Sequence, residues 1–94
     1  MDNLQSNHLT RQKLTSGAFV FVEGDQDQHF YIVESGEIEI ITMINGGTNQ
    51  LMVCGPGESF GEFALLASTP RSASARALSD CTLIKVSREG FEEL

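Results

Sequence analysis

Residues 60–75 have the sequence FGEFALLASTPRSASA, which gathers a glycine, one acidic side chain, one basic side chain and many small residues in a short segment. Glycine at position 61 lets other groups approach the backbone closely. Residues 64–66 are typical of one turn of helix with free N-terminal amides, and Pro70 stiffens the chain directly before Arg71. The segment therefore predicts a cradle for a small anion.

Arg71 is the candidate that binds the anion. A guanidinium presents two parallel N–H donors that match two oxygens of a phosphodiester. The Glu62 carboxylate would repel the same anion, so it makes chemical sense only if it faces another part of the ligand, such as a sugar hydroxyl. The alternative is a surface ion pair between Glu62 and Arg71, worth at most about 1 kcal/mol to stability. The small residues around the two charges favour the ligand site.

The rest of the chain predicts short strands separated by turns. Aromatic and β-branched residues alternate with turn signals at residues 23–25 and 45–47. The predicted strands cover residues 18–22, 30–33, 37–43, 50–54, 74–78 and 81–86. Ser87 is placed to cap a helix that begins at residue 88.

This pattern predicts a mainly β fold, an antiparallel β-roll or jelly-roll-like barrel. It carries one short helix in the 60–75 segment and helical remnants at the termini. Residues 1–12 are predicted as a lead-in or partial helix, and residues 13–94 as one domain that ends at the start of a C-terminal helix.

Composition limits the function classes. A chain of 94 residues, 40% of them hydrophobic, buries one small core. It contains no apolar run near the roughly 20 residues of a membrane span and no signal pattern at the N-terminus. A net charge of −7 with only six Lys and Arg argues against a nucleic-acid surface, and no helix-turn-helix of a DNA-binding regulator is predicted. We expect a cytoplasmic setting, or the cytoplasmic face of a membrane protein, without direct contact with membrane or nucleic acid.

The cysteines and histidines do not predict chemistry. Cys54 and Cys81 are too few for a disulfide framework and are expected to be reduced core thiols. His8 and His29 are too few for a metal site of the cupin kind. No nucleophile and base are paired, so we expect neither a metal site nor an enzyme.

Residues 60–77 resemble the phosphate-binding cassette of cyclic nucleotide-binding domains. These are the β-roll modules of protein kinase regulatory subunits, cyclic nucleotide-gated channels and bacterial catabolite-activator regulators. Upstream, residues 23–25, 30–37 and 56–59 resemble the strands and turns that precede the cassette, so almost the whole chain takes part. The resemblance implies a non-enzymatic sensor that binds a cyclic purine mononucleotide, cAMP or cGMP, and needs no cofactor. It also implies an attached or partner effector, such as a kinase, a channel or an exchange factor. An interaction module that keeps the roll without binding nucleotide is the alternative.

The resemblance also implies roles for single residues. Glu62 takes the ribose 2′-hydroxyl, Arg71 takes the cyclic phosphate, and backbone groups of Gly61, Ala64 and Ala73 close around them. Ser72 can reach the ligand, but it leaves the choice between adenine and guanine open. The full predicted ligand-binding set is Gly61, Glu62, Phe63, Ala64, Arg71, Ser72 and Ala73.

Three further expectations follow from the resemblance. In kinase regulatory subunits an acid at the position of Glu34 holds the phosphate arginine, which predicts a supporting pair between Glu34 and Arg71; a solvated turn residue is the alternative. The family usually carries Gly-Asp where this chain has Asp-Gln at residues 27–28, so the turn there is expected to form differently. The family continues into a hinge helix and a lid helix past residue 94, so we expect the chain to be an excised module, or a short domain whose cap over the base comes from another segment or subunit.

Overall fold

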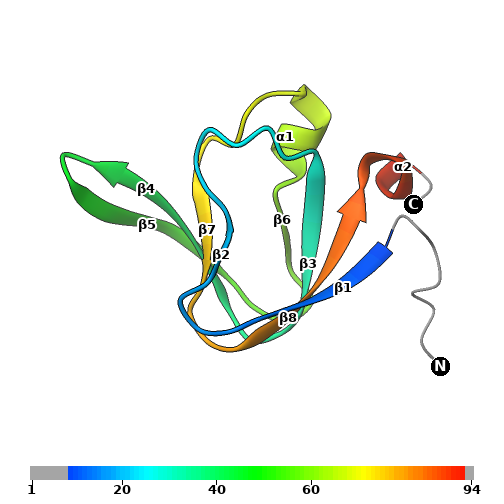
Figure 1. Ribbon diagram of the computed structural model, residues 1–94, viewed down its shortest axis with the longest axis horizontal. Helices are drawn as coiled ribbons and strands as arrows, with labels where there is room; N and C mark the ends of the chain where they lie inside the picture. The colour runs from blue at the N-terminus through cyan, green and yellow to red at the C-terminus, as the bar shows by residue number, and fades with distance from the viewer. Residues whose placement is uncertain (1–8, 93–94) are drawn as a thin grey trace.

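The computed structural model describes residues 9–92 and shows a roll of two facing β-sheets with two short helices (Figure 1). In chain order the elements are β1 (Leu9–Leu14), β2 (Phe19–Phe21), β3 (His29–Ser35), β4 (Ile38–Ile44), β5 (Gly47–Cys54), β6 (Ser59–Phe60), α1 (Glu62–Ala67), β7 (Ser74–Ala77), β8 (Cys81–Ser87) and α2 (Arg88–Glu92). Neither of these helices has the length or the apolar character needed to cross a membrane.

Both sheets are antiparallel and have four strands each. One sheet has the order β1-β8-β3-β6, and the other has the order β2-β7-β4-β5. The chain passes repeatedly between the sheets, so strands far apart in sequence lie side by side; β8, for example, pairs with both β1 and β3. This topology confirms the predicted antiparallel β-roll.

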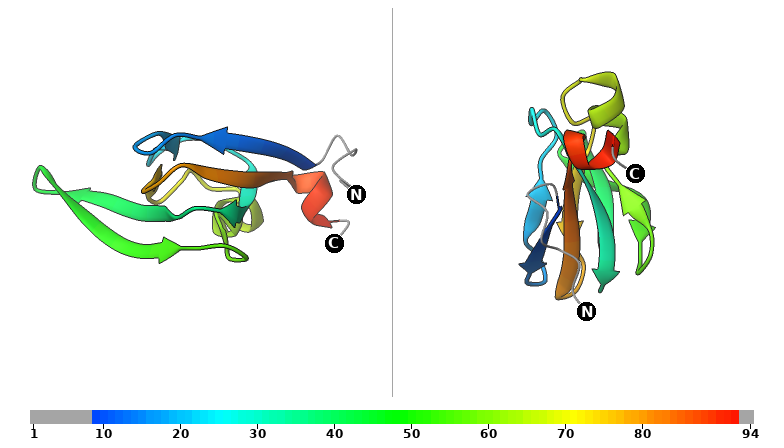
Figure 2. Two further views of the ribbon diagram at one scale, coloured as in Figure 1. Left: turned by 90° about the horizontal axis from the view of Figure 1, so that it is seen from below. Right: turned by 90° about the vertical axis from the view of Figure 1, so that its right-hand side faces the viewer.

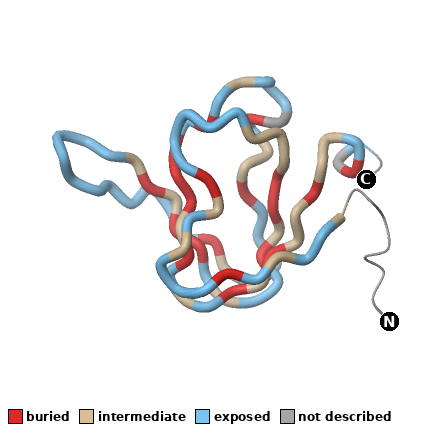
Figure 3. Tube along the Cα trace, viewed as in Figure 1, coloured by how far each residue is buried: buried red, intermediate tan, exposed pale blue. Residues whose placement is uncertain are grey.

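The core lies between the two sheets and follows the alternation of side chains along the strands. Ile38, Leu83 and Ala75 are completely buried there. The rings of Tyr31 and Phe60 stack with their centroids 5.3 Å apart. Figure 3 shows that burial is greatest in the middle of the strands and falls off in the turns. The stacked rings of Tyr31 and Phe60 lie where β3 and β6 pair, directly before α1, so aromatic packing forms this end of the core.

The hairpin of β4 and β5 projects from the body of the roll (Figure 2). Its turn contains Asn45 with φ 51° and Gly46 with φ 79°, the two left-handed residues that such a two-residue turn requires. These angles confirm the turn predicted at residues 45–47. The sequence could predict it because the conformation of such a turn depends on local chemistry.

The N-terminal boundary predicted at residue 12 falls inside β1. All six residues of β1 pair with β8, from Leu9 opposite Val86 to Leu14 opposite Cys81. A polar sequence of this kind becomes a strand because a distant partner supplies its hydrogen bonds, which local patterning does not reveal. Of the lead-in or partial helix predicted over residues 1–12, residues 1–8 lie outside the described residues. The helix expected from residue 88 is confirmed by α2.

Ser87 caps α2 as predicted. Its hydroxyl accepts a hydrogen bond from the backbone N–H of Gly90 at 3.1 Å. This satisfies one of the donors that the first turn of a helix leaves without a partner inside the helix.

Candidate functional site

A cavity of about 370 Å³ opens between α1 and the inner face of the β2-β7-β4-β5 sheet. Its volume lies within the range of roughly 300–1,000 Å³ that is usual for small-molecule sites. All seven predicted ligand-binding residues line it: Gly61, Glu62, Phe63, Ala64, Arg71, Ser72 and Ala73. The remaining lining residues are Phe21, Ile40, Met52, Ser59 and Phe60. The structure therefore brings the predicted residues together around one opening with one largely apolar wall.

Backbone geometry places Arg71 at this cavity. Its N–H donates to the carbonyl oxygen of Asp25 at 2.8 Å, and its own carbonyl accepts from the N–H of Gly24 at 2.8 Å. Gly61 precedes α1 with φ 90°, a conformation that other residues rarely adopt. A Cβ at position 61 would lie 2.8 Å from Nη1 of Arg71, so the glycine is required by the close approach of the guanidinium.

The Arg71 guanidinium is buried, with only 2% of the side chain exposed. Nη1 donates to the carbonyl oxygen of Gly61 at 2.7 Å, and Nη2 donates to the carbonyl oxygen of His29. Nη2 also lies 3.1 Å from Oδ2 of Asp27. The guanidinium carbon lies 3.9 Å from the centroid of the Phe21 ring, a cation–π arrangement. Nε is buried and has no hydrogen-bond partner among residues 9–92.

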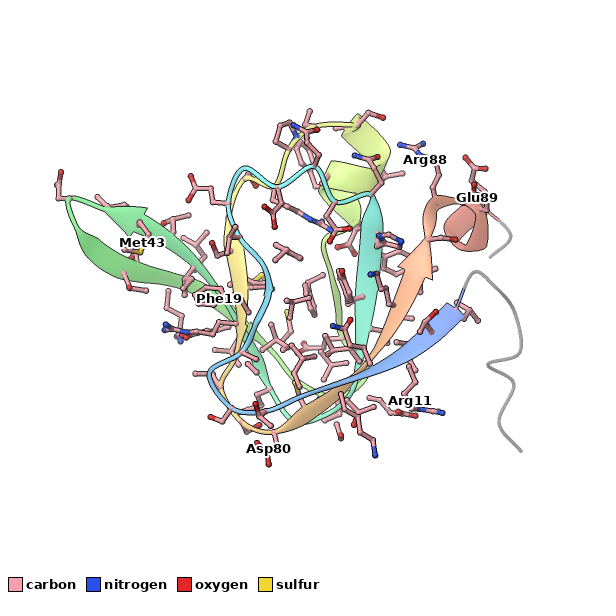
Figure 4. All side chains as sticks on the ribbon, viewed as in Figure 1. Arg11, Phe19, Met43, Asp80, Arg88 and Glu89 are labelled. Carbon is pink, nitrogen blue, oxygen red and sulfur yellow. The ribbon has the colours of Figure 1, made fainter. Side chains whose placement is uncertain are left out.

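The predicted pair between Glu34 and Arg71 is wrong. Glu34 instead pairs with Arg11, with Nε to Oε1 at 2.8 Å and Nη2 to Oε2 at 3.0 Å. Figure 4 shows Arg11 directed away from the interior of the roll. The reason is strand alternation, because Val33 faces the core and Glu34, the next residue on β3, faces the opposite side.

Asp27 is the acid that holds Arg71, and sequence reasoning missed it. Its Oδ2 accepts from the Tyr31 hydroxyl at 2.9 Å, and its Oδ1 lies 2.7 Å from Nδ1 of His29. Burial raises the pKa of Asp27, but hydrogen bonds from His29, Tyr31 and Arg71 and the charge of Arg71 outweigh it and leave the pKa below its usual value. The sequence could have indicated this pairing through the spacing of residues 27, 29 and 31, because alternate residues of an extended segment share one face.

The Tyr31 hydroxyl is tied to the same acid. Burial, together with the charge and the hydrogen bond of Asp27, raises the pKa of Tyr31 well above its ordinary value. The hydroxyl therefore remains a neutral donor to the Asp27 carboxylate at physiological pH.

Glu62 lies on another part of the cavity lining. Its Oε2 accepts a hydrogen bond from the Ser59 hydroxyl at 3.0 Å. Among residues 9–92, no ion pair joins Glu62 to Arg71, which argues against the alternative of a simple surface pair. The site thus separates one acid and one base, as two different groups of one ligand would require.

The cysteines and histidines were the other candidates for chemistry in the sequence. Cys54 and Cys81 are free and buried, as predicted. Burial raises the pKa of both thiols, and nearby acids raise it further. Within the described part of the chain, no cluster of three or more potential metal ligands occurs. His29 is bonded to Asp27, and His8 lies outside the described residues.

Comparison with known proteins agrees with this geometry. The family described as "Cyclic nucleotide-binding domain" matches residues 11–94. The chain belongs to the cyclic nucleotide-binding domain family. The resemblance of the 60–77 segment is thereby confirmed.

Relatives of this cyclic nucleotide-binding domain include kinase regulatory subunits and a cyclic AMP receptor protein. The cAMP-dependent protein kinase regulatory subunit of Yarrowia lipolytica is 37% identical over 89 residues, which are 92% of this chain and 22% of that protein. The cyclic AMP receptor protein of Thermus thermophilus is 37% identical over 90 residues, 95% of this chain and 42% of that protein. The regulatory domain of Toxoplasma gondii PKA, solved with cAMP, has a TM-score of 0.86 at 35% identity and covers 92% of this chain and 33% of that one. The chain spans less than half the length of each, and it is a cyclic nucleotide-binding domain of the type found in these regulators.

Proposed function

We propose that this domain is a non-enzymatic sensor that binds cAMP, with Arg71 on the cyclic phosphate and Glu62 on the ribose 2′-hydroxyl. The observation that carries the proposal is the buried guanidinium in the cavity lining, whose Nε has no hydrogen-bond partner in the described part of the chain. A buried donor without a partner costs free energy, and an anionic oxygen is a strong acceptor for it.

The cavity suits the remaining parts of such a ligand. Glu62 and Ser59 supply polar groups, whereas Phe21, Ile40 and Met52 supply apolar surface against which a purine and a ribose can pack. A nucleotide of about 22 heavy atoms at roughly −0.3 kcal/mol per atom would bind with about −7 kcal/mol, or a dissociation constant on the order of 10 μM. Contacts from a cap over the base would add to this affinity.

Adenine is the first candidate for the base. The supporting observation is that the named relatives are a cAMP-dependent kinase subunit and a cyclic AMP receptor. Ser72 lines the cavity with an exposed side chain, which leaves its hydroxyl able to meet either purine. We further propose that binding shifts a two-state equilibrium in an attached effector, through differential contacts in the two states.

The test is calorimetric titration with cAMP and cGMP of the wild type, Arg71→Lys and Arg11→Lys. A lysine cannot reproduce the donor geometry of a buried guanidinium, so Arg71→Lys should weaken cAMP binding by about 2–3 kcal/mol, roughly 30- to 150-fold. Arg11→Lys makes the same exchange at the exposed pair with Glu34 and should bind like wild type. Absence of saturable binding of either nucleotide to the wild type up to millimolar concentration would reject the proposal and favour the interaction module. Selective loss of cGMP binding in Ser72→Ala would assign that hydroxyl to guanine, and equal loss for both nucleotides would point to a phosphate contact.

A further inference from the structure

We propose that Asp27 is an internal counter-ion that competes with the ligand for Arg71, so that it stabilises the fold and lowers the affinity of the site for the phosphate. This inference rests on the proposed function, because it concerns the same arginine. It assigns to Asp27 a role in setting affinity beyond its contribution to packing.

The geometry fixes the Asp27 carboxylate beside the guanidinium. Oδ2 lies 3.1 Å from Nη2 of Arg71 and accepts from the Tyr31 hydroxyl at 2.9 Å. Oδ1 accepts from the backbone N–H of His29 at 3.2 Å and lies 2.7 Å from its Nδ1. With both oxygens held by β3, the carboxylate is not free to swing away when another anion approaches Arg71. Its charge therefore stays next to the guanidinium.

The charge balance of the cavity makes this carboxylate important. Among the described residues that line the cavity, Arg71 is the one cation and Glu62 is the one acid. Asp27 is not among the named lining residues, but it neutralises Arg71 from beside Nη2, with 17% of its own side chain exposed. An anionic ligand therefore meets a site without net positive charge, and removal of Asp27 alone would change that balance by one unit.

The size of the effect follows from Coulomb's law. Two anions that bond to one guanidinium lie roughly 5–7 Å apart. At that separation, in the effective dielectric of a protein site, their repulsion changes affinity by about 3- to 30-fold once screening by solvent is allowed for. Substitution of Asp27 by a neutral residue should therefore tighten cAMP binding by about 3- to 30-fold.

The same substitution should weaken the fold. A buried guanidinium without its counter-charge is costly, and the Tyr31 hydroxyl loses its acceptor. The counter-ion role thus predicts opposite changes, with a lower melting temperature and a tighter complex. A residue that only shaped the turn would lower both stability and affinity when it is replaced.

The experiment compares wild type, Asp27→Asn, Asp27→Ser and Glu34→Gln in cAMP titrations and in thermal melts at several cAMP concentrations. Asp27→Asn keeps the shape, and Asp27→Ser removes the charge without placing an amide NH₂ against Arg71 and Tyr31. Glu34→Gln is the matched control, since it removes one negative charge from β3 at a residue that pairs with Arg11. We expect both Asp27 variants to melt at lower temperature without nucleotide and to bind cAMP about 3- to 30-fold more tightly. Glu34→Gln should stay within about twofold of wild type in affinity, because a distant exposed charge is screened.

Each contrary outcome has its own meaning. Affinity that is unchanged or weaker in both Asp27 variants, with normal binding by the wild type, overturns the counter-ion role and leaves the proposed function standing. No binding by the wild type overturns the proposed function itself. If an Asp27 variant melts without a cooperative transition, its affinity follows from the cAMP dependence of refolding. A variant that remains unfolded at saturating cAMP also overturns the inference, because the phosphate should then replace the lost charge.

Discussion

Substitution of Gly61 by alanine tests the close approach between the start of α1 and Arg71. Gly61 has φ 90°, so a side chain there is strained by about 1–2 kcal/mol. The new Cβ would lie 2.8 Å from Nη1 and 3.4 Å from Cζ of Arg71, which forces the guanidinium to move. Movement breaks the bond from Nη1 to the Gly61 carbonyl, and a charge-assisted hydrogen bond contributes about 1.5–3 kcal/mol. We therefore expect Gly61→Ala to lower the free energy of unfolding by about 2.5–5 kcal/mol.

Gly57→Ala is the control for this variant. Gly57 has φ 87°, yet a Cβ there would meet no atom of the described residues within 4 Å. Its replacement should cost only the backbone strain of about 1–2 kcal/mol. Urea denaturation gives the two free energies, and cAMP titration should show a loss of at least about tenfold for Gly61→Ala against less than about twofold for Gly57→Ala. Equal destabilisation of the two variants, with unchanged cAMP affinity in Gly61→Ala, would refute the claim that Arg71 requires a glycine at position 61.

Two further predictions concern the titratable groups of the second sheet and the core. Hydrogen bonds from Gln50 and Arg76, with the charge of Arg76, hold the pKa of the buried Glu39 below its ordinary value of 4.5. A lowered folded-state pKa contributes stability that is present above the ordinary value and is lost as the pH falls through it, so thermal melts should show a decline below about pH 5 that is smaller in Glu39→Gln. Cys54 and Cys81 are buried, and their pKa values are raised. A thiol reagent such as Ellman's should therefore label neither cysteine in the folded domain and both in urea. Rapid labelling of the native domain would contradict the burial of these thiols.

Sequence reasoning succeeds where local chemistry determines structure. The turn at Asn45 and Gly46 needs two left-handed residues, and an Asn-Gly pair supplies them with little strain. The helix within residues 60–75 likewise follows from a glycine and a run of helix-forming residues. By contrast, β1 becomes a strand through pairing with β8, which lies about 70 residues later in the chain, and no feature of residues 9–14 alone encodes that partner.

The same distinction applies to the site. The seven lining residues from Gly61 to Ala73 lie in one segment, and the prediction that they gather around a ligand needed only that segment. The partner of Arg71 comes from elsewhere in the chain, and there the prediction chose the wrong acid. Glu34 lies within β3 and Asp27 lies two residues before it, and only Asp27 is an even number of residues from Tyr31 and meets its hydroxyl. The alternation of side chains along β3 was therefore a better guide to the acid that pairs with Arg71 than the resemblance to kinase regulatory subunits.

Arg71 connects the stability of this domain to its proposed ligand. The guanidinium is part of the buried interior, held by Gly61, His29 and Asp27, and it is also the group that would meet the phosphate. Substitutions around it should therefore separate into two kinds. A methyl group at position 61 displaces the guanidinium from internal partners and ligand alike, so stability and affinity should fall together. Loss of the Asp27 charge removes a competitor and leaves the guanidinium in place, so stability should fall while affinity rises. Stability and affinity that fall together indicate a group that shapes the site. Stability that falls while affinity rises indicates a group that competes with the ligand.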